Sequence, residues 1–233
     1  LSIAQSLDKL RIDVIEAGFP VISEGDFIAC KDIAKLGLKS EIIGLARLKK
    51  LDIDKVIEAD LDSIHLFIAT SDLHMKEKLK MSEEQVLEKI EEFVSYSKAH
   101  YDEVLFSAED ATRSDLEFLI KANKLAVENG ATRINVPDTV GTITPHAFGY
   151  VVRKIYETLP KNIRIGVHCH NDFGLAVANT IAGFENGASE AQTTIMGLGE
   201  RAGNASFEET TMSLYALYQI PMKINTKLIF PTA

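Results

Sequence analysis

The sequence predicts a (β/α)8 barrel of the TIM type, with its first strand missing from this chain. Short apolar segments typical of strands alternate with longer helical segments, and the strands start near residues 14, 41, 64, 104, 133, 164 and 191. The resulting repeat of about 30 residues is typical of a parallel sheet with crossover helices. No glycine-rich phosphate-binding motif follows the first strand, which disfavours a doubly wound sheet. Because the chain begins on a helix and offers seven strands, we expect the eighth to precede Leu1.

The first half of the chain carries clear helix and strand signals. Residues 1–10 have apolar side chains at helical spacing, with Ser2 as the expected N-cap. Residues 25–36 are expected to form a helix that ends at Gly37. The remaining elements are expected as strands over 14–20, 41–47 and 63–71 and as helices over 53–59 and 82–100, the last opened by the capping box from Ser82 to Gln85.

The second half continues the same alternation. Gly130 and Gly187 are expected to end two of its helices, while Thr144 and Pro160 bound a third. Strands are expected over 103–108, 133–138, 164–169 and 190–196, and helices over 114–129, 145–159, 175–186 and 207–217.

Composition limits the classes of function. A chain of 233 residues with 46% hydrophobic side chains can bury a substantial core. Its net charge of −9 argues against a nucleic-acid surface. The two cysteines, Cys30 and Cys169, offer no disulfide framework, which favours a reducing cytoplasm. No apolar run is long enough to span a bilayer, so we expect no membrane association.

Polar residues gather where the expected strands end. In a barrel of parallel strands the active site lies at the carboxyl ends, so such a concentration is expected at a catalytic rim. Loop residues without a function would show no bias toward one end. The residues are Glu16, Arg47, Thr70, Ser71, Ser107, Glu109, Asp110, Asn135, Asp138, Thr139, His168, His170, Asn171, Asp172, Glu200, Arg201 and Asn204.

Two histidines at the end of the strand over 164–169 are the strongest single signal. His168 and His170 are two residues apart, so they point to the same side, while Val167 and Cys169 point to the other. Two converging imidazoles form half of a divalent-metal site. The alternative is a pair of hydrogen-bonded structural histidines.

The glycine-rich segment over 197–205 follows the last strand. Three glycines within seven residues permit a tight backbone and close approach of a ligand. Asn204 could offer a carbonyl oxygen beside the two histidines, since hard divalent ions accept such ligands. The alternative is that Asn204 caps the final helix.

Other strand ends offer groups for substrate binding or proton transfer. Ser107 and Glu109 share one side of their strand, and a carboxylate there could hold a substrate or move a proton, or else pair with Arg113. Asn135 and Thr139 share one side of the following strand segment, where they could bind a carboxylate or a carbonyl group.

Further polar residues allow a structural and a functional reading. Asp138 has the opposite parity to Asn135 and is expected to be structural. His65 lies on an apolar strand, where a satisfied core histidine is the alternative to a functional one. The remaining histidines (His74, His100 and His146) are expected at the surface, and Lys76, Lys78 and Lys80 form either a solvated loop or a site that attracts a phosphorylated cofactor.

Taken together, these segments resemble the family of 2-isopropylmalate, homocitrate and citramalate synthases. The motifs His168–Asp172 and Gly197–Ala205 are specific, and shorter ones recur in the same order at 15–20, 65–71, 107–110 and 135–141. The resemblance covers nearly the whole chain and is greatest to 2-isopropylmalate synthases. It implies one catalytic barrel domain over 1–233, incomplete because the first strand and the domains after the barrel are absent.

The resemblance implies a Claisen condensation of acetyl-CoA with a 2-oxoacid, followed by thioester hydrolysis. The expected substrate is 2-oxoisovalerate, which gives 2-isopropylmalate for leucine biosynthesis. A divalent metal (Mn, Mg, Zn or Co) would bind the 2-oxoacid and stabilise the alkoxide that develops on it. A cytoplasmic homodimer is expected when the protein is full length. The resemblance implies Glu109 and His65 as catalytic residues, with His65 also lining the substrate pocket. The implied substrate-binding residues are Arg47, Ser107, Asn135 and Thr139. The implied metal ligands are His168, His170 and Asn204.

The sequence departs from the family pattern in one large respect. The Arg-Asp-Gly-Glu-Gln stretch of the family's first strand, whose Asp completes the metal site, does not occur here. We therefore expect the chain to belong to a longer protein rather than to act alone. The rival functions are homocitrate or citramalate synthase, an acyl-CoA lyase of the same superfamily, a metal-dependent hydrolase with a barrel fold, and an inactive fragment or partner subunit.

Overall fold

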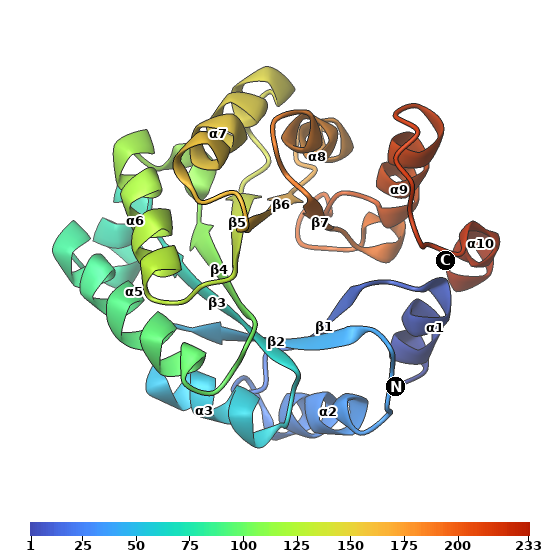
Figure 1. Cartoon of the computed structure of the whole chain (residues 1–233), viewed down its shortest axis with the longest axis horizontal. Coiled ribbons are helices and arrows are strands. Elements are labelled where there is room, and N and C mark those ends of the chain that lie inside the picture. The colour runs from blue at the N-terminus through green and yellow to red at the C-terminus, as the bar shows by residue number, and fades with distance from the viewer.

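The computed structural model describes all of residues 1–233, and its centre is a sheet of seven strands (Figure 1). The strands are β1 (Val14–Gly18), β2 (Glu41–Arg47), β3 (Ser63–Ala69), β4 (Val104–Glu109), β5 (Arg133–Asp138), β6 (Arg164–Cys169) and β7 (Glu190–Gln192).

Helices follow the strands and surround the sheet. The α-helices are α1 (Ser2–Leu10), α2 (Glu24–Ala34), α3 (Lys50–Glu58), α4 (Asp72–His74), α5 (Glu83–Lys98), α6 (Leu116–Glu128), α7 (Pro145–Thr158), α8 (Ala176–Glu185), α9 (Phe207–Ala216) and α10 (Ile229–Thr232). A π-helical turn η1 (Met75–Leu79) and three 3₁₀ turns, η2 (Ala111–Arg113), η3 (Ile195–Gly197) and η4 (Thr226–Leu228), complete the set. None of the helices combines the length and the apolar character needed to cross a lipid bilayer.

The predicted fold class is confirmed. The strands pair in the order β1-β2-β3-β4-β5-β6-β7, and every pair is parallel. The sheet curls so that the helices lie outside it, as Figure 1 shows. No hydrogen bonds join β7 to β1, so the barrel is open there and is one strand short of eight.

Strand alternation divides the side chains between the barrel interior and the layer under the helices. On β3, Ile64 and Leu66 are fully buried in the main apolar core, whereas His65 has the opposite parity. On β5, Ile134 and Val136 join the same core, and Asn135 points the other way. The sheet therefore packs aliphatic side chains against the helices and leaves polar ones for the interior.

The predicted element boundaries hold to within a few residues, with two larger differences. The strand expected over 190–196 is only Glu190–Gln192, because the chain turns into η3, where Met196 has left-handed backbone angles. The helix expected to begin at residue 53 begins at Lys50.

Of the three predicted N-caps, two hold their positions and Ser2 does not. The capping box is confirmed, since the Gln85 side chain accepts from the Ser82 amide and the Ser82 hydroxyl accepts from the Gln85 amide. Ser2 is already helical, and Leu1 holds the N-cap position. Thr144 is the N-cap of α7 but makes no capping hydrogen bond, and the helix instead starts with Pro145, which fixes the first-turn backbone.

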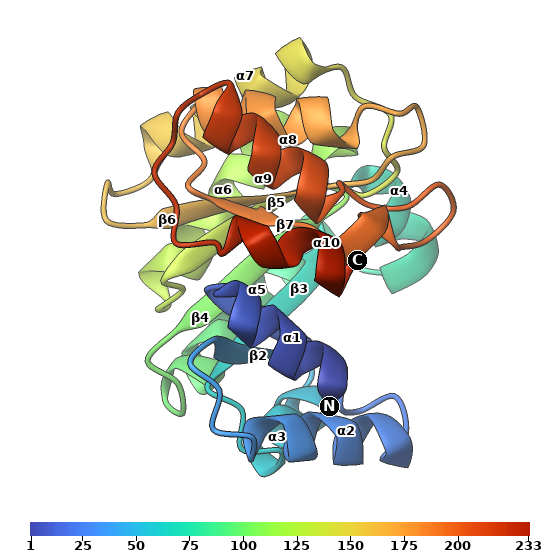
Figure 2. The ribbon, with the colours of Figure 1, turned by 90° about the vertical axis from the view of Figure 1, so that its right-hand side faces the viewer.

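The two ends of the chain lie together beside the opening of the barrel. Leu10 of α1, Phe207 of α9 and Ile229 of α10 form a small second core, and the Asn225 amide donates to the Leu10 carbonyl at 2.9 Å. Figure 2 shows α10 against α1 on this side.

The amino ends of the strands hold a buried ionic cluster. Arg133 is 1% exposed, and its guanidinium contacts Glu41 and lies 3.5 Å from Glu103. Arg164 bridges Glu103 at 2.7 Å and Glu190 at 3.1 Å. Each carboxylate therefore faces a guanidinium. The cluster lies at the amino ends of the strands, opposite the end where barrels of this type carry their active sites, and is assigned to stability.

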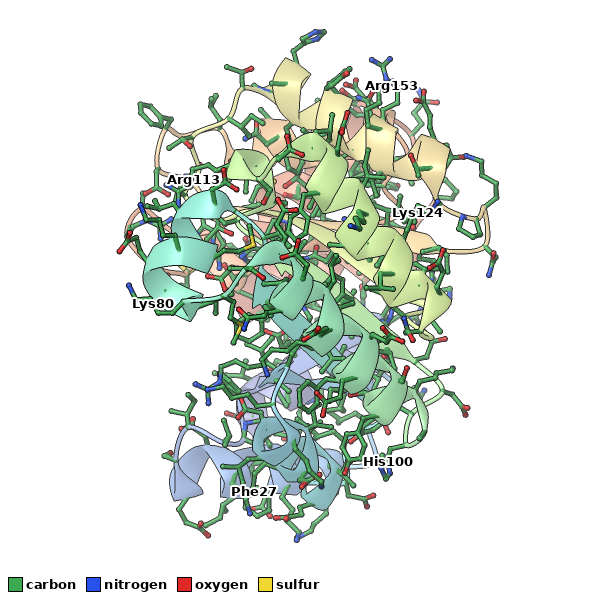
Figure 3. The ribbon with its side chains drawn as sticks, turned by 90° about the vertical axis from the view of Figure 1, so that its left-hand side faces the viewer. Phe27, Lys80, His100, Arg113, Lys124 and Arg153 are labelled. Carbon is green, nitrogen blue, oxygen red and sulfur yellow. The ribbon has the colours of Figure 1, made fainter.

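Removing Arg133 is expected to destabilise the fold strongly. Arg133→Ala leaves Glu41 and Glu103 partly buried without their shared cation, and breaking a buried pair in this way costs about 3–5 kcal/mol. The free energy of unfolding from urea denaturation measures the effect. Arg153→Ala, which removes an arginine that points to solvent in Figure 3, is the matched control and should change it by less than about 0.5 kcal/mol. Equal effects of the two substitutions would contradict the assignment.

Candidate active site

Five strands contribute to one chain of hydrogen bonds inside the barrel. His65 on β3 lies at its centre and is 5% exposed. Its Nδ1 is 2.6 Å from Oε2 of Glu16 on β1, and its Nε2 is 2.6 Å from Oγ of Ser107 on β4. The order carboxylate, imidazole and hydroxyl fixes the imidazole at both nitrogens. His65 and Ser107, predicted from separate segments, are thus in direct contact.

The chain continues to β5 and β7. Asn135 donates from Nδ2 to Ser107 Oγ at 2.9 Å and to Gln192 Oε1 at 3.3 Å. Its Oδ1 is buried without a partner. Gly166 on β6 leaves space here, because a Cβ at that position would lie 3.2 Å from Asn135 Oδ1. The Oδ1 atom of Asn135 is therefore an acceptor without a partner.

The partners determine the direction of the hydrogen bonds. An ionised carboxylate only accepts, so Nδ1 of His65 carries a proton and donates to Glu16. In the neutral imidazole, Nε2 then accepts from the Ser107 hydroxyl. Desolvation would raise the pKa of Glu16, but the hydrogen bond that His65 donates favours the charged carboxylate, and the pKa is lowered. Glu16 therefore stays charged and orients the ring.

Glu16 and Gln192 were missing from the predicted site. Glu16 was recognised as a polar strand end, but its sequence neighbourhood does not indicate His65 as its partner, 49 residues later. Gln192 lies in a short strand and carries no motif of its own. Only the barrel, which brings β1 beside β2 and β7 beside β6, places both side chains around the same interior.

The histidine pair lies at the carboxyl end of β6, as its parity predicts. His168 Nε2 is 3.0 Å from His170 Nε2, and Nδ1 of each ring is buried without a hydrogen-bond partner. Burial, followed by the charge of His170, lowers the pKa of His168 to about 4, and burial also lowers the pKa of His170. Two neutral rings can approach so closely, and neutral imidazole is the form that binds metals.

Asn204 lies beside the histidine pair and does not cap the final helix. It forms a backbone bridge to His170, and its Oδ1 is buried without a partner. The cap of α9 is Ser206, whose hydroxyl accepts from the Glu209 amide at 3.3 Å, so that alternative is wrong. Gly199 permits the arrangement, because a Cβ there would lie 2.7 Å from the Asn204 side chain.

These side chains offer an incomplete set of metal ligands. The Nδ1 atoms of His168 and His170 and the Oδ1 atom of Asn204 have no hydrogen-bond partner, and imidazole nitrogens and amide oxygens are ligands that suit a divalent ion. No group of three His, Cys, Asp or Glu side chains in the chain is arranged to hold a metal. The donors are also all neutral, so a charged ligand would be needed for tight binding of a hard cation.

Glu109 lies at the mouth of the barrel and is held by the segment after β3. Its Oε1 is 2.5 Å from Lys78 Nζ and 3.5 Å from His74 Nδ1. Arg113, considered above as a partner for Glu109, instead pairs with the buried Asp110 at 2.8 Å. His74 was expected at the surface, but the tight turn after Ser71 directs it toward Glu109, and its side chain is 22% exposed.

Three other predicted residues lie apart from these groups. Arg47 pairs with the buried Asp52 at 2.6 Å and lies 5.3 Å from the Phe19 ring. Thr139 accepts the Asp110 amide with its hydroxyl at 2.9 Å. Asp138 is fully buried and bound by Thr112 and Asn179, in agreement with a structural role.

Comparison with protein families places the whole chain in one family. A family model described as HMGL-like matches residues 1–233. The chain is 49% identical over 233 residues to a probable 2-isopropylmalate synthase of Ignicoccus hospitalis and 52% identical over 227 residues to a 2-isopropylmalate synthase of Saccharolobus solfataricus. It is also 49% identical over 229 residues to a homocitrate synthase of Methanopyrus kandleri.

These relatives are longer than the chain. The matched regions cover 100%, 97% and 98% of the chain but 58%, 59% and 57% of the relatives from I. hospitalis, S. solfataricus and M. kandleri. The chain therefore spans less than two thirds of the length of the curated relatives it matches.

Solved structures confirm the fold. The chain is similar to a hydroxymethylglutaryl-CoA lyase of Pseudomonas aeruginosa, with a TM-score of 0.87 and 18% identity over 99% of this chain and 82% of that one. The HMG-CoA lyase of Bacillus subtilis gives a TM-score of 0.83 and 18% identity over 99% and 82%. At this identity the likeness concerns the fold alone.

Glu16 and Ser107 are expected to be energetically coupled through His65. Glu16→Ala removes the acceptor of Nδ1 and should lower the free energy of unfolding by about 1–2 kcal/mol. Glu16→Gln keeps an acceptor and should lower it less. In a double-mutant cycle with Ser107→Ala, the effects should differ from additivity by at least about 0.5 kcal/mol. Glu91→Ala, at an exposed position of α5, is the control, and strict additivity would show that the chain of hydrogen bonds does not form in solution.

Proposed function

Because the chain belongs to the HMGL-like family, we propose that it forms the catalytic barrel of an acyltransferase that condenses acetyl-CoA with a 2-oxoacid. The observation that carries the proposal is the placement of His168, His170 and Asn204, each with a buried polar atom that has no hydrogen-bond partner, beside the interior network of His65. Both groups occupy the end of the barrel where this fold performs chemistry.

The metal in this proposal is a divalent ion, Mn, Mg, Zn or Co. His168, His170 and the Asn204 oxygen would hold it. When bound, it would supply Lewis acidity to the keto group of the 2-oxoacid. A carboxylate from outside these three residues is required to complete the site, since all three are neutral.

Glu109 is the proposed general base. Lys78 and His74 both contact Oε1, and no hydrogen bond or ion pair reaches Oε2. Oε2 would accept a proton from the methyl group of acetyl-CoA, and the resulting carbanion would attack the keto carbon of the 2-oxoacid. Hydrolysis of the thioester would then release coenzyme A.

The interior network supports an alkyl 2-oxoacid, with 2-oxoisovalerate as the proposed substrate and 2-isopropylmalate, on the route to leucine, as the product. Glu16, His65 and Ser107 satisfy one another and offer no spare cation. The free Asn135 Oδ1 is an acceptor and would repel a second carboxylate. This favours an alkyl side chain over the dicarboxylate used in homocitrate synthesis, and a smaller alkyl group would correspond to citramalate synthesis.

Two further residues are proposed to contact the substrate. Thr139 follows the end of β5 and accepts the Asp110 amide, and its hydroxyl would meet the carboxylate of the 2-oxoacid. Arg47 would need to exchange its contact with Asp52 for one with the substrate. Residues 1–233 would then be the catalytic domain of a cytoplasmic homodimer.

The second candidate function is acyl-CoA cleavage, which the likeness to HMG-CoA lyases suggests at the level of fold. Mass spectrometry separates the two reactions. The longest natural polypeptide that carries these residues is supplied either with acetyl-CoA and 2-oxoisovalerate or with 3-hydroxy-3-methylglutaryl-CoA. Formation of 2-isopropylmalate supports the proposal, and cleavage of the second compound alone would contradict it. Neither activity would favour a partner subunit.

Metal binding offers a test that does not depend on activity. Titration of the chain with Mn²⁺, followed by electron paramagnetic resonance, should show weak binding. His168→Ala or His170→Ala should weaken it at least about tenfold, since each removes one of the nitrogen donors. His100→Ala, at an exposed position, is the control. Unchanged binding in both histidine variants would exclude the pair as the metal site.

A further inference from the structure

The segment after β3 forms a rigid arm over the mouth of the barrel. Ser71 begins α4 and donates its hydroxyl to the buried Asp110 at 2.5 Å. Met75, at the start of the π-helical turn η1, is 5% exposed and belongs to the main core. Lys80 ends the turn with left-handed backbone angles. Asp110, which Ser71 contacts, and Met75 are both buried, so these two contacts hold the arm in place.

The arm presents two side chains to Glu109. His74 and Lys78 are four residues apart and lie on the same side of the helical segment. Lys78 Nζ is 2.5 Å and His74 Nδ1 3.5 Å from the same oxygen, Glu109 Oε1. The Nδ1 atom makes no hydrogen bond, and it also lies 3.7 Å from Asp110 Oδ2. Single-turn π-helical segments are frequent at functional sites, where they direct particular side chains.

We propose that Lys78, with His74, is a positioning residue that holds the Glu109 carboxylate by one oxygen and leaves the other free for proton transfer. The inference deepens the proposed function and rests on the role of Glu109 given there. Rotation about the last bond of a free glutamate exchanges its two oxygens. A cation fixed on Oε1 stops that exchange and keeps Oε2 directed away from the arm.

The other cations near Glu109 do not contact its carboxylate. Arg113 uses its guanidinium on Asp110 and lies 3.5 Å from His74 Nε2. Lys76 and Lys80 are 83% and 70% exposed and approach only Glu77. Figure 3 shows Lys80 and Arg113 at the same edge of the molecule. No other lysine or arginine reaches Glu109.

A purely structural role would not explain the arrangement. The Lys78 side chain is 52% exposed, and ion pairs at exposed positions contribute little to stability. Its loss should therefore leave the melting temperature nearly unchanged. A positioning role instead predicts a loss in kcat with an unchanged KM for the 2-oxoacid, because only the orientation of the base is altered.

The first measurement compares variants in the longest natural polypeptide that carries these residues. Lys78→Met should lower kcat about tenfold, while Lys78→Arg, which restores a cation, should recover most of it. His74→Ala should lower kcat less, because its contact is longer. Lys76→Met and Lys80→Met, on the same arm but away from Glu109, are the controls and should keep the original kcat.

The second measurement detects the contact without any activity. Brief acetylation of the chain with acetic anhydride, read by mass spectrometry, should modify Lys78 more slowly than Lys76 and Lys80, because its ammonium is engaged by Glu109. Glu109→Gln should raise the rate at Lys78 to that of the other two and leave theirs unchanged.

The two measurements distinguish the possible failures. Equal acetylation of the three lysines in the unaltered chain would overturn the inference, whatever the activity. Slow acetylation of Lys78 together with full kcat in Lys78→Met would also overturn it. If the polypeptide shows no condensation at all, the proposed function fails, and the role of the arm in that reaction fails with it. Acetylation would still report whether Lys78 contacts Glu109.

Discussion

Polar side chains inside the barrel must satisfy one another, and this constraint organises the site. Every inward residue of a parallel strand faces a space that water enters poorly, so an unpartnered donor there is costly. Glu16, His65, Ser107, Asn135 and Gln192 meet the constraint as one hydrogen-bonded chain from β1 to β7. Around the candidate site the exceptions carry the functional information, because Asn135, His168, His170 and Asn204 each keep a buried polar atom without a hydrogen-bond partner.

The fold follows from local patterns, which explains how much of it the sequence predicts. Alternation with period two and a repeat of about 30 residues depend on neighbours in the chain, so the seven strands and the facing of His168 with His170 could be predicted. Helix caps depend on single hydrogen bonds and are less certain: Ser2 was wrong, and Thr144 holds the N-cap position without a capping hydrogen bond. The boundary of β7 failed because the chain leaves the sheet after Gln192, where Thr194 bonds to the segment over 205–207 instead of to β6.

The contacts within the site depend on distant residues and could not be predicted from the sequence. The family resemblance assigned His65 and Ser107 to the substrate pocket, but their contact joins residues 42 apart, and Glu16, which holds the other nitrogen of His65, is 49 residues from it. The position of His74 could not be predicted either. The path of the chain after Ser71 decides whether this side chain faces solvent or Glu109. The family resemblance supplied candidate roles, whereas the geometry separates held groups, such as Arg47 on Asp52, from groups with free atoms.

The central claim is that His65 is saturated by its neighbours, while His168 and His170 are available to a metal ion. Nitrogen-15 NMR of the histidine rings tests it directly. Without metal, His65 should show a proton on Nδ1, and His168 and His170 should be neutral at pH 7. On addition of Zn²⁺, the signals of His168 and His170 should shift, and those of His65 should not. A metal-dependent shift at His65, with the other two rings unaffected, would contradict the account.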